Sequence, residues 1–415
     1  MRTYEADWVT EIRKKASASI NSLPLPRGEF IDIMKFIKSP KEIPKIEKIE
    51  DAPKEVLDLF EKMGISEEER KMFFGLSVQA NDNVIYKKVR DELAKKQIII
   101  EAMDVALKKY DWLKEYFFNL VKYDENKLTA YHAANWKNGV FVWAKGKYDL
   151  PIHAYFMLLS PLYSQMEHTV VIAEPHSKIF LVEGCTAPLF IRESVHIGIN
   201  EIYIKDNAEL TLTKLQNWPK HVHTRPISKI VLGNNSKLHL INVIYGGGAS
   251  TVEYPEIEIR GDNSKVSVES IVFTKSSKVK LGATVYVRGK QSSVVLPSKA
   301  IASEASSILI EDEIKAFSKC KGHISCDGIL LDDKSEIESV PALFTKHKDA
   351  ELSHEASIGR LNEEALFYLM SRGLDEETAR AVLIKGFVEP VLKHLPFQYR
   401  IEINKLLEIA AQGSM

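Results

Sequence analysis

A short repeat constrains the fold of this chain more than any other feature. A small residue is followed by apolar residues two and four places later, and the copies begin at Ala208, Ser236, Ser264, Ser277, Ser292 and Ser306. The first three copies start 28 residues apart, and the later ones follow every 13 to 16 residues. Repeats of this size, with one short strand in each, predict a solenoid.

The alternation within each copy places both apolar residues on one face, which we take as the inner face. A parallel β-helix with about 28 residues per coil is the simplest fit. An antiparallel sandwich is the alternative, but it does not need a sequence template kept in register. We therefore predict a mainly β fold, with a parallel β-helix core over residues 126–360 and α-helical domains over residues 1–125 and 361–415.

Helical spacing or capping residues mark the two ends of the chain. The predicted helical segments are residues 5–20, a helix capped by Ser66, residues 83–96, residues 101–122, a helix capped by Asn362, a helix capped by Asp375 that ends before Pro390, and residues 397–411.

Composition excludes several classes of protein. Among the 415 residues, 56 Lys and Arg nearly balance 57 Asp and Glu, which gives no reason to expect a nucleic-acid or membrane partner. The polar N-terminus does not resemble a secretory signal, and no apolar stretch approaches the length of a membrane span. The three cysteines argue against a disulfide framework and favour a reducing cytoplasm.

The last repeats keep the pattern but change its residues. Segments that begin at Gly322, Ser335 and Ala350 carry Cys326, Ser339 and His354 at the second apolar place. Because Cys326 and His354 are one coil apart, we expect them to be stacked inside the solenoid, with Glu355 at its rim. They could simply hydrogen-bond each other and complete the core. A thiolate, an imidazole and a carboxylate would also suit a metal or sulfur site.

Several motifs together carry a resemblance to the SufB/SufD family, the core of the SUF scaffold for iron–sulfur cluster assembly. The matching stretches include Val182–Pro188, Gln216–Trp218, Arg260–Ser264, Cys326–Asp327, His354–Ser357 and Glu364–Tyr368. The match extends from about residue 66 to 393, and it implies a right-handed parallel β-helix between helical domains.

The resemblance implies roles for individual residues. Cys326 resembles the cysteine essential for cluster formation, Glu355 its acidic partner, and His354 the functional histidine of SufD-type chains. Cys185 resembles the cysteine that receives persulfide sulfur. Gln216 and Trp218 fall where the family is thought to line a sulfur route. Five coils separate Cys185 from Cys326, or ~24 Å, so sulfur would need an internal path.

The resemblance also implies a non-enzymatic scaffold that holds a transient iron–sulfur cluster. Its expected partners are a SufC-like ABC ATPase docked on residues 361–411, a cysteine desulfurase or other sulfur donor, and a second SufB/SufD-like subunit or a second copy. One chain has too few ligands, so we expect a site shared across a dimer. The use of reduced flavin is left open.

Three alternatives remain at this stage. The chain lacks an N-terminal cysteine cluster and mixes SufB and SufD features, so it could be a SufD-like structural partner or a subunit that serves as both. A β-helix carbohydrate-active enzyme is a remote alternative. Cys320 could assist as a thiol, but we interpret it as structural.

Overall fold

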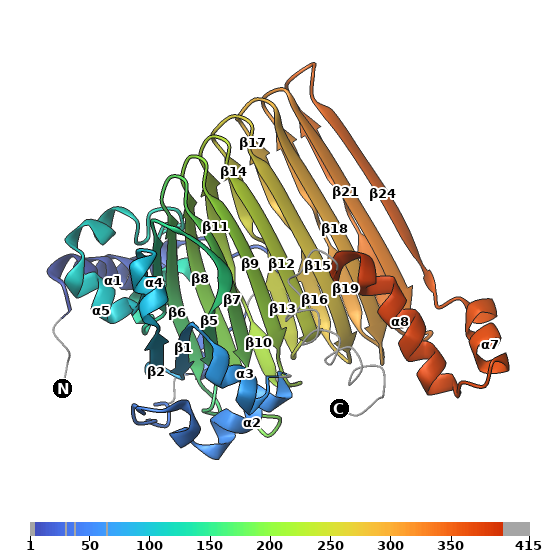
Figure 1. The fold of residues 1–415 in the computed structure, drawn as a ribbon, viewed down its shortest axis with the longest axis horizontal. Helices are drawn as coiled ribbons and strands as arrows, with labels where there is room; N and C mark the ends of the chain where they lie inside the picture. Colours follow the sequence, from blue (N-terminus) through green and yellow to red (C-terminus); the bar gives the residue numbers. More distant parts are fainter. Residues whose placement is uncertain (1–4, 30, 37–38, 64, 393–415) are drawn as a thin grey trace.

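The computed structural model describes residues 5–29, 31–36, 39–63 and 65–392, and its core is a parallel β-solenoid (Figure 1). One wall is a ten-stranded sheet. Its strands in spatial order are β2 (Asn83–Val89), β1 (Gly75–Ala80), β5 (Lys147–Met157), β7 (Lys178–Thr186), β9 (Glu209–Asn217), β12 (Lys237–Gly246), β15 (Lys265–Lys275), β18 (Ser292–Ser303), β21 (Cys320–Leu330) and β24 (Glu351–Arg360).

The second wall begins with long strands and then divides into two rows of short ones. Its strands are β3 (Ile98–Ala102), β4 (Val140–Ala144), β6 (Ser164–Ala173), β8 (Ser194–Ile204), β10 (Val222–Thr224), β11 (Ile227–Leu232), β13 (Ser250–Glu253), β14 (Glu256–Ile259), β16 (Lys278–Leu281), β17 (Thr284–Val287), β19 (Ser307–Ile310), β20 (Glu313–Ala316), β22 (Glu336–Ser339) and β23 (Ala342–Thr345). In the described residues every strand pair is parallel except β1–β2 and β3–β4, which excludes the sandwich.

The repeat places the strands as predicted. Strands β9, β12 and β15 each begin one residue after the small residue of a copy, at Ala208, Ser236 and Ser264. The copies that begin at Ser277 and Ser306 lie in the other wall, before β16 and β19. The 28-residue coil is therefore confirmed. The apolar residues of the copies in the first wall stack in one interior cluster, and those of the copies that begin at Ser277 and Ser306 lie in a second one.

A row of left-handed residues turns each of the middle coils at the same corner. Asn207, Asn235, Asn263 and Gln291 have φ between 52° and 59°. Asparagine tolerates this conformation better than most residues. The residue before each turn ties two coils together, since Asp206 accepts the Asn234 backbone N–H at 2.7 Å.

The helices lie at the two ends of the chain. Their bounds are α1 (Asp7–Ser19), α2 (Lys54–Lys62), α3 (Glu67–Met72), α4 (Asp91–Lys95), α5 (Met103–Lys109), α6 (Lys127–Asn135), α7 (Glu363–Ser371) and α8 (Glu376–Leu392), with short 3-10 helices at Ile20–Ser22, Ile33–Phe36, Ile49–Asp51 and Asp111–Glu115. The capping box at Ser66 and the Asn362 cap are both present.

Three helix predictions need comment. The helix expected over 83–96 is wrong, because β2 pairs with β1 over Asn83–Val89 and only the short α4 follows. Helix α8 does not stop before Pro390 but continues through it. The helix expected over 397–411 lies outside the described residues.

Helices cover parts of both walls from outside. Helices α1, α5 and α6 contribute to an apolar cluster against the outer face of β6 and β8. Helix α8 packs Ile384 and Val388 on the outer face of the first wall, while α7 projects beyond β24 (Figure 1). None of the described helices is long and apolar enough to cross a membrane.

Helix α2 is joined to the solenoid by Lys62, whose ammonium group donates a hydrogen bond to the Ala187 carbonyl oxygen at 3.2 Å. Burial lowers the pKa of Lys62 to about 8. Between pH 8 and 10.5 the unfolded chain binds this proton and the folded chain does not. Stability linked to Lys62 should therefore rise with pH across that window.

We predict that Lys62→Met removes this rise. The free energy of unfolding of the parent should increase relative to the variant by at most about 1.4 kcal/mol per pH unit, measured by urea unfolding at several pH values. The slope should fall below this limit, since water still reaches part of the side chain. Parallel pH profiles for the two proteins would contradict the prediction.

Candidate functional site

A column of polar side chains runs through the interior of the solenoid. Its six members stack in register on consecutive strands and are all buried: Glu183, Lys214, Asn242, Ser270, Ser298 and Cys326. One apolar cluster, containing Leu240, lies on one side of these residues, and another, containing Ile244, lies on the other side. We call the six residues the polar column. Sequence reasoning found only its last member.

The polar column corrects the predicted place of Cys326. Strand β21 pairs with β18 in the register Cys320–Ser292, Gly322–Val294, Ile324–Leu296 and Cys326–Ser298. The repeat therefore begins at Cys320, and the predicted start at Gly322 is wrong by two residues. Glycine occupies an apolar place there and resembles the small starting residue. Cys326 thus continues a polar row instead of replacing a leucine.

Cys326 is surrounded by oxygen-bearing side chains. Burial raises the pKa of its thiol, and a hydrogen bond with Ser339 opposes that rise. The neighbouring carboxylate is Asp312, which is buried and accepts the Ser298 hydroxyl at 3.1 Å and the Ala283 backbone N–H at 2.8 Å. Burial raises the pKa of Asp312 to about 6. Asp312 could not be predicted from the repeat, because it lies between β19 and β20 and outside the repeated pattern.

His354 and Glu355 lie on β24, the last strand, and both are exposed. His354 pairs with Ile324, and it is Ala356 that lies beside Cys326. The predicted stack of Cys326 on His354 is therefore wrong, since this coil holds two more residues than those before it. The side chains of His354 and Cys326 both face the interior, but they lie two residues apart along the paired strands. Glu355 points to the outer face, where its carboxylate lies 3.5 Å from His323 Nε2.

Cys185, Gln216 and Trp218 lie close to one another. Cys185 is buried on β7 and pairs in register with Gln216 on β9. The indole N–H of Trp218 donates to Gln216 Oε1 at 3.3 Å. Burial raises the pKa of the Cys185 thiol, and the carboxylates of Glu167 and Glu183 raise it further. The resting thiol is therefore protonated at neutral pH.

The polar column connects the two cysteines. Glu183 precedes Cys185 by two residues on the same face of β7, and five strand spacings, or ~24 Å, separate β7 from β21. Near Cys185, the column is held by Glu253, which accepts Lys214 Nζ at 2.5 Å and Asn242 Nδ2 at 3.0 Å. Buried polar groups need such partners. The polar column is therefore a continuous row of polar side chains that begins beside Cys185 and ends at Cys326.

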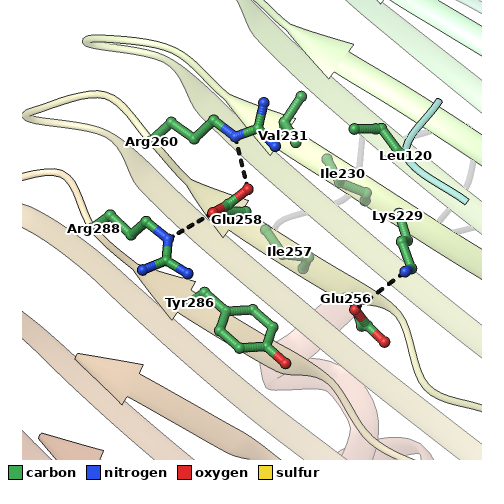
Figure 2. Close-up of a pocket in the computed structure, with 10 residues that line it drawn as sticks. All are labelled: Leu120, Lys229, Ile230, Val231, Glu256, Ile257, Glu258, Arg260, Tyr286 and Arg288. Carbon is green, nitrogen blue, oxygen red and sulfur yellow. Dashed lines mark hydrogen bonds and ion pairs between the residues drawn. The ribbon is translucent and has the colours of Figure 1, made fainter. Parts of the chain in front are cut away.

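No ready-made metal centre exists in the described residues, since no three His, Cys, Asp or Glu side chains converge there. A hollow of about 250 Å³ lies elsewhere, on the outer face of β11, β14 and β17 (Figure 2). Charged side chains that line this hollow form ion pairs with one another, because Arg260 and Arg288 both bind Glu258. It contains none of the predicted site residues.

Comparisons with known proteins give the family. Residues 158–387 match the family described as "SUF system FeS cluster assembly, SufBD core domain". An iron–sulfur cluster assembly SufBD family protein of Pyrococcus horikoshii is 40% identical, over 99% of this chain and 94% of its own length. A protein of the same description from Staphylococcus haemolyticus is 31% identical, over 99% and 91%. The chain belongs to the SufBD family of iron–sulfur cluster assembly proteins.

Proposed function

We propose that this chain is a scaffold subunit on which iron–sulfur clusters are built, with Cys326 as the essential cluster ligand. The observation that carries the proposal is the polar column, which extends from beside Cys185 to Cys326 through an otherwise apolar interior. A buried row of polar side chains lowers the stability of the fold unless every polar group is paired. A protein that keeps such a row therefore has a functional reason to do so. Sulfur transport between the cysteines gives it a purpose.

In this scheme Cys185 receives sulfur from a persulfide donor, such as a cysteine desulfurase. The Cys185 thiol loses its proton and attacks the terminal sulfur of the donor persulfide, the donor sulfur–sulfur bond breaks, and the donor thiolate leaves and takes up that proton. This exchange has no net redox change. Release of the sulfur as sulfide then takes two electrons, which a thiol or a reduced flavin would supply. Gln216 and Trp218 line the start of the path.

The incomplete ligand set favours a shared site. Strand β24 is the last strand of its wall and is exposed along most of its length, and such an edge is a template for pairing with another chain. Pairing of two copies, or of this chain with a SufB/SufD-like partner, would bring His354 and Cys326 of each subunit toward one interface. Two thiolates and two imidazoles would then be available to the nascent cluster, with Glu355 at the rim.

The proposal includes an ABC-type ATPase as a partner. Helix α7 exposes Phe367 and Tyr368, which are 73% and 59% exposed, and exposed large apolar side chains favour a docking surface. ATP-driven movement transmitted through these helices would open the end of the solenoid at Cys326. The three free cysteines fit a reducing compartment, so we place this work in the cytoplasm.

The first test is cluster reconstitution on Cys326→Ser with the ATPase, a persulfide donor and ferrous iron. We expect at least about a tenfold loss of the visible absorbance of the cluster, because a hydroxyl is a poor ligand for iron–sulfur clusters. Cys320→Ser is the matched control, since Cys320 is buried on the same face of β21 and should tolerate the change. Normal yield with Cys326→Ser would favour the SufD-like structural role instead.

A second test concerns access to the site. Cys326 is 1% exposed, so a maleimide should modify it slowly in the isolated chain, as followed by mass spectrometry of the peptide. Addition of the ATPase and ATP should accelerate modification of Cys326 by about tenfold or more, while modification of Cys185 provides the internal reference. Rapid modification without nucleotide would show that no opening step is required.

A third test addresses the docking surface. Phe367→Ser should weaken binding of the ATPase by about tenfold or more, because exposed aromatic residues often dominate such interfaces. Binding can be measured by titration calorimetry. Leu25→Ser, which alters another exposed apolar residue, 57% exposed and far along the chain, is the control and should bind normally. Equal affinities for both variants would place the docking surface elsewhere.

A further inference from the structure

Several buried oxygen atoms in the first coils have no hydrogen-bond partner in the described part of the chain, and three of them belong to one group of interior residues. These three are Glu167 Oε2 and Thr169 Oγ1 on β6, and Glu183 Oε1 on β7. All three residues are at most 4% exposed. Unpaired oxygens in such a place are costly, and two of them belong to carboxylates. Their grouping indicates a place built to receive something.

The remaining contacts hold the two carboxylates in place. The Glu167 carboxylate packs against Gly198. A Cβ atom at position 198 would lie 2.1 Å from Glu167 Oε1, so the absence of a side chain at Gly198 leaves the space that the carboxylate occupies. Glu183 Oε2 accepts Asn200 Nδ2 at 3.4 Å. Since Gly198 pairs with Glu167 and Asn200 with Thr169 in the β6–β8 register, these residues form one compact patch of the interior.

His196 adds a nitrogen lone pair to this patch. Gln165 donates both amide hydrogens to backbone carbonyls, of Asn81 and Met157, which makes its Oε1 atom an acceptor. His196 Nδ1, 3.0 Å from that oxygen, must therefore carry the proton. In the neutral ring, Nε2 is then an acceptor, and it lies 3.3 Å from the acceptor Glu167 Oε1. Two acceptors facing each other require either a proton or a metal ion between them.

The charges of the region agree with this reading. Lys214 is the buried ammonium group here, and it pairs with Glu253 at 2.5 Å. Glu167 has only His196 as an ion-pair partner in the described residues. Burial raises the pKa of the Glu183 carboxyl to about 7, and the nearby Lys214 ammonium group opposes that rise without forming an ion pair with it. Buried carboxylates are normally paired with a cation or coordinate a metal.

We propose that Glu167, Glu183 and His196 form an internal binding site for ferrous iron, beside Cys185. Imidazole with two carboxylates is a ligand set suited to ferrous iron, and a ligating histidine typically donates its other N–H to a carbonyl oxygen, as His196 does to Gln165. The ligands do not yet converge. Binding therefore requires the Glu183 carboxylate to turn its free oxygen toward His196.

The choice of iron rests on the proposed function, whereas the cation site rests on the contacts alone. If the site holds iron, metal and sulfur enter the solenoid at the same end. Cys185 then lies close enough to add a thiolate or persulfide ligand to the bound ion. The polar column would begin at a point where both ingredients are already present.

The test measures iron binding by the full chain in a Cys326→Ser background, so that the cluster site contributes nothing. Under anaerobic equilibrium dialysis, this parent should bind about one ferrous ion per chain, and Glu167→Gln or Glu183→Gln should weaken binding by about tenfold or more. Glu174→Gln is the control, because this carboxylate binds Lys205 on the outer face and should not matter. A matching arm with Mg²⁺ alone should show weak binding.

Unfolding of a variant would not obscure the result. Replacement of a buried carboxyl by an amide of the same shape should leave the melting temperature without iron nearly unchanged, and iron should raise the melting temperature of the parent but not of either variant. X-ray absorption of the bound iron should show nitrogen and oxygen ligands including an imidazole. Absence of iron binding by the parent, undiminished binding by both variants, or a spectrum without imidazole would overturn the inference.

Discussion

The structure depends on one constraint, which is that successive coils stack in register at a constant period. In a parallel stack each inward position lies directly on the same position of the next coil, about 4.8 Å away. A residue type repeated every 28 positions therefore becomes a continuous row in space. Leucine and valine at two positions make an apolar core. Polar residues at a third position make the polar column, which no single coil could contain.

The period of the repeat also explains why the observed site differs from the site predicted from the sequence. Most of the fold could be predicted, because the repeat specifies strand spacing, inward faces and parallel pairing without any long-range knowledge. Local chemistry located the helix starts at Ser66 and Asn362. Strand β2 was missed because its partner, β1, is not encoded in the repeat, and tertiary pairing overrode the helical spacing of its residues.

The candidate site could be predicted only in part. Cys185, Gln216 and Trp218 were named through family resemblance, and their proximity follows from one cross-strand pair. The stacking of Cys326 on His354 failed for two local reasons, a glycine in an apolar place and a coil with two additional residues. A strictly periodic sequence pattern detects neither of these irregularities. The signal for the polar column was present, six residues after each small residue, but only the register reveals its importance.

The two ends of the solenoid are unequal. At the first end, Leu93 of α4 is buried with residues of β3 inside the interior cluster, which closes that end. At the other end, Leu343 and Leu352 are only partly buried and β24 lies open (Figure 1). A rod with two open ends would add copies indefinitely and form a filament. A rod with one open end can join only one other, so any assembly through β24 would terminate at a pair.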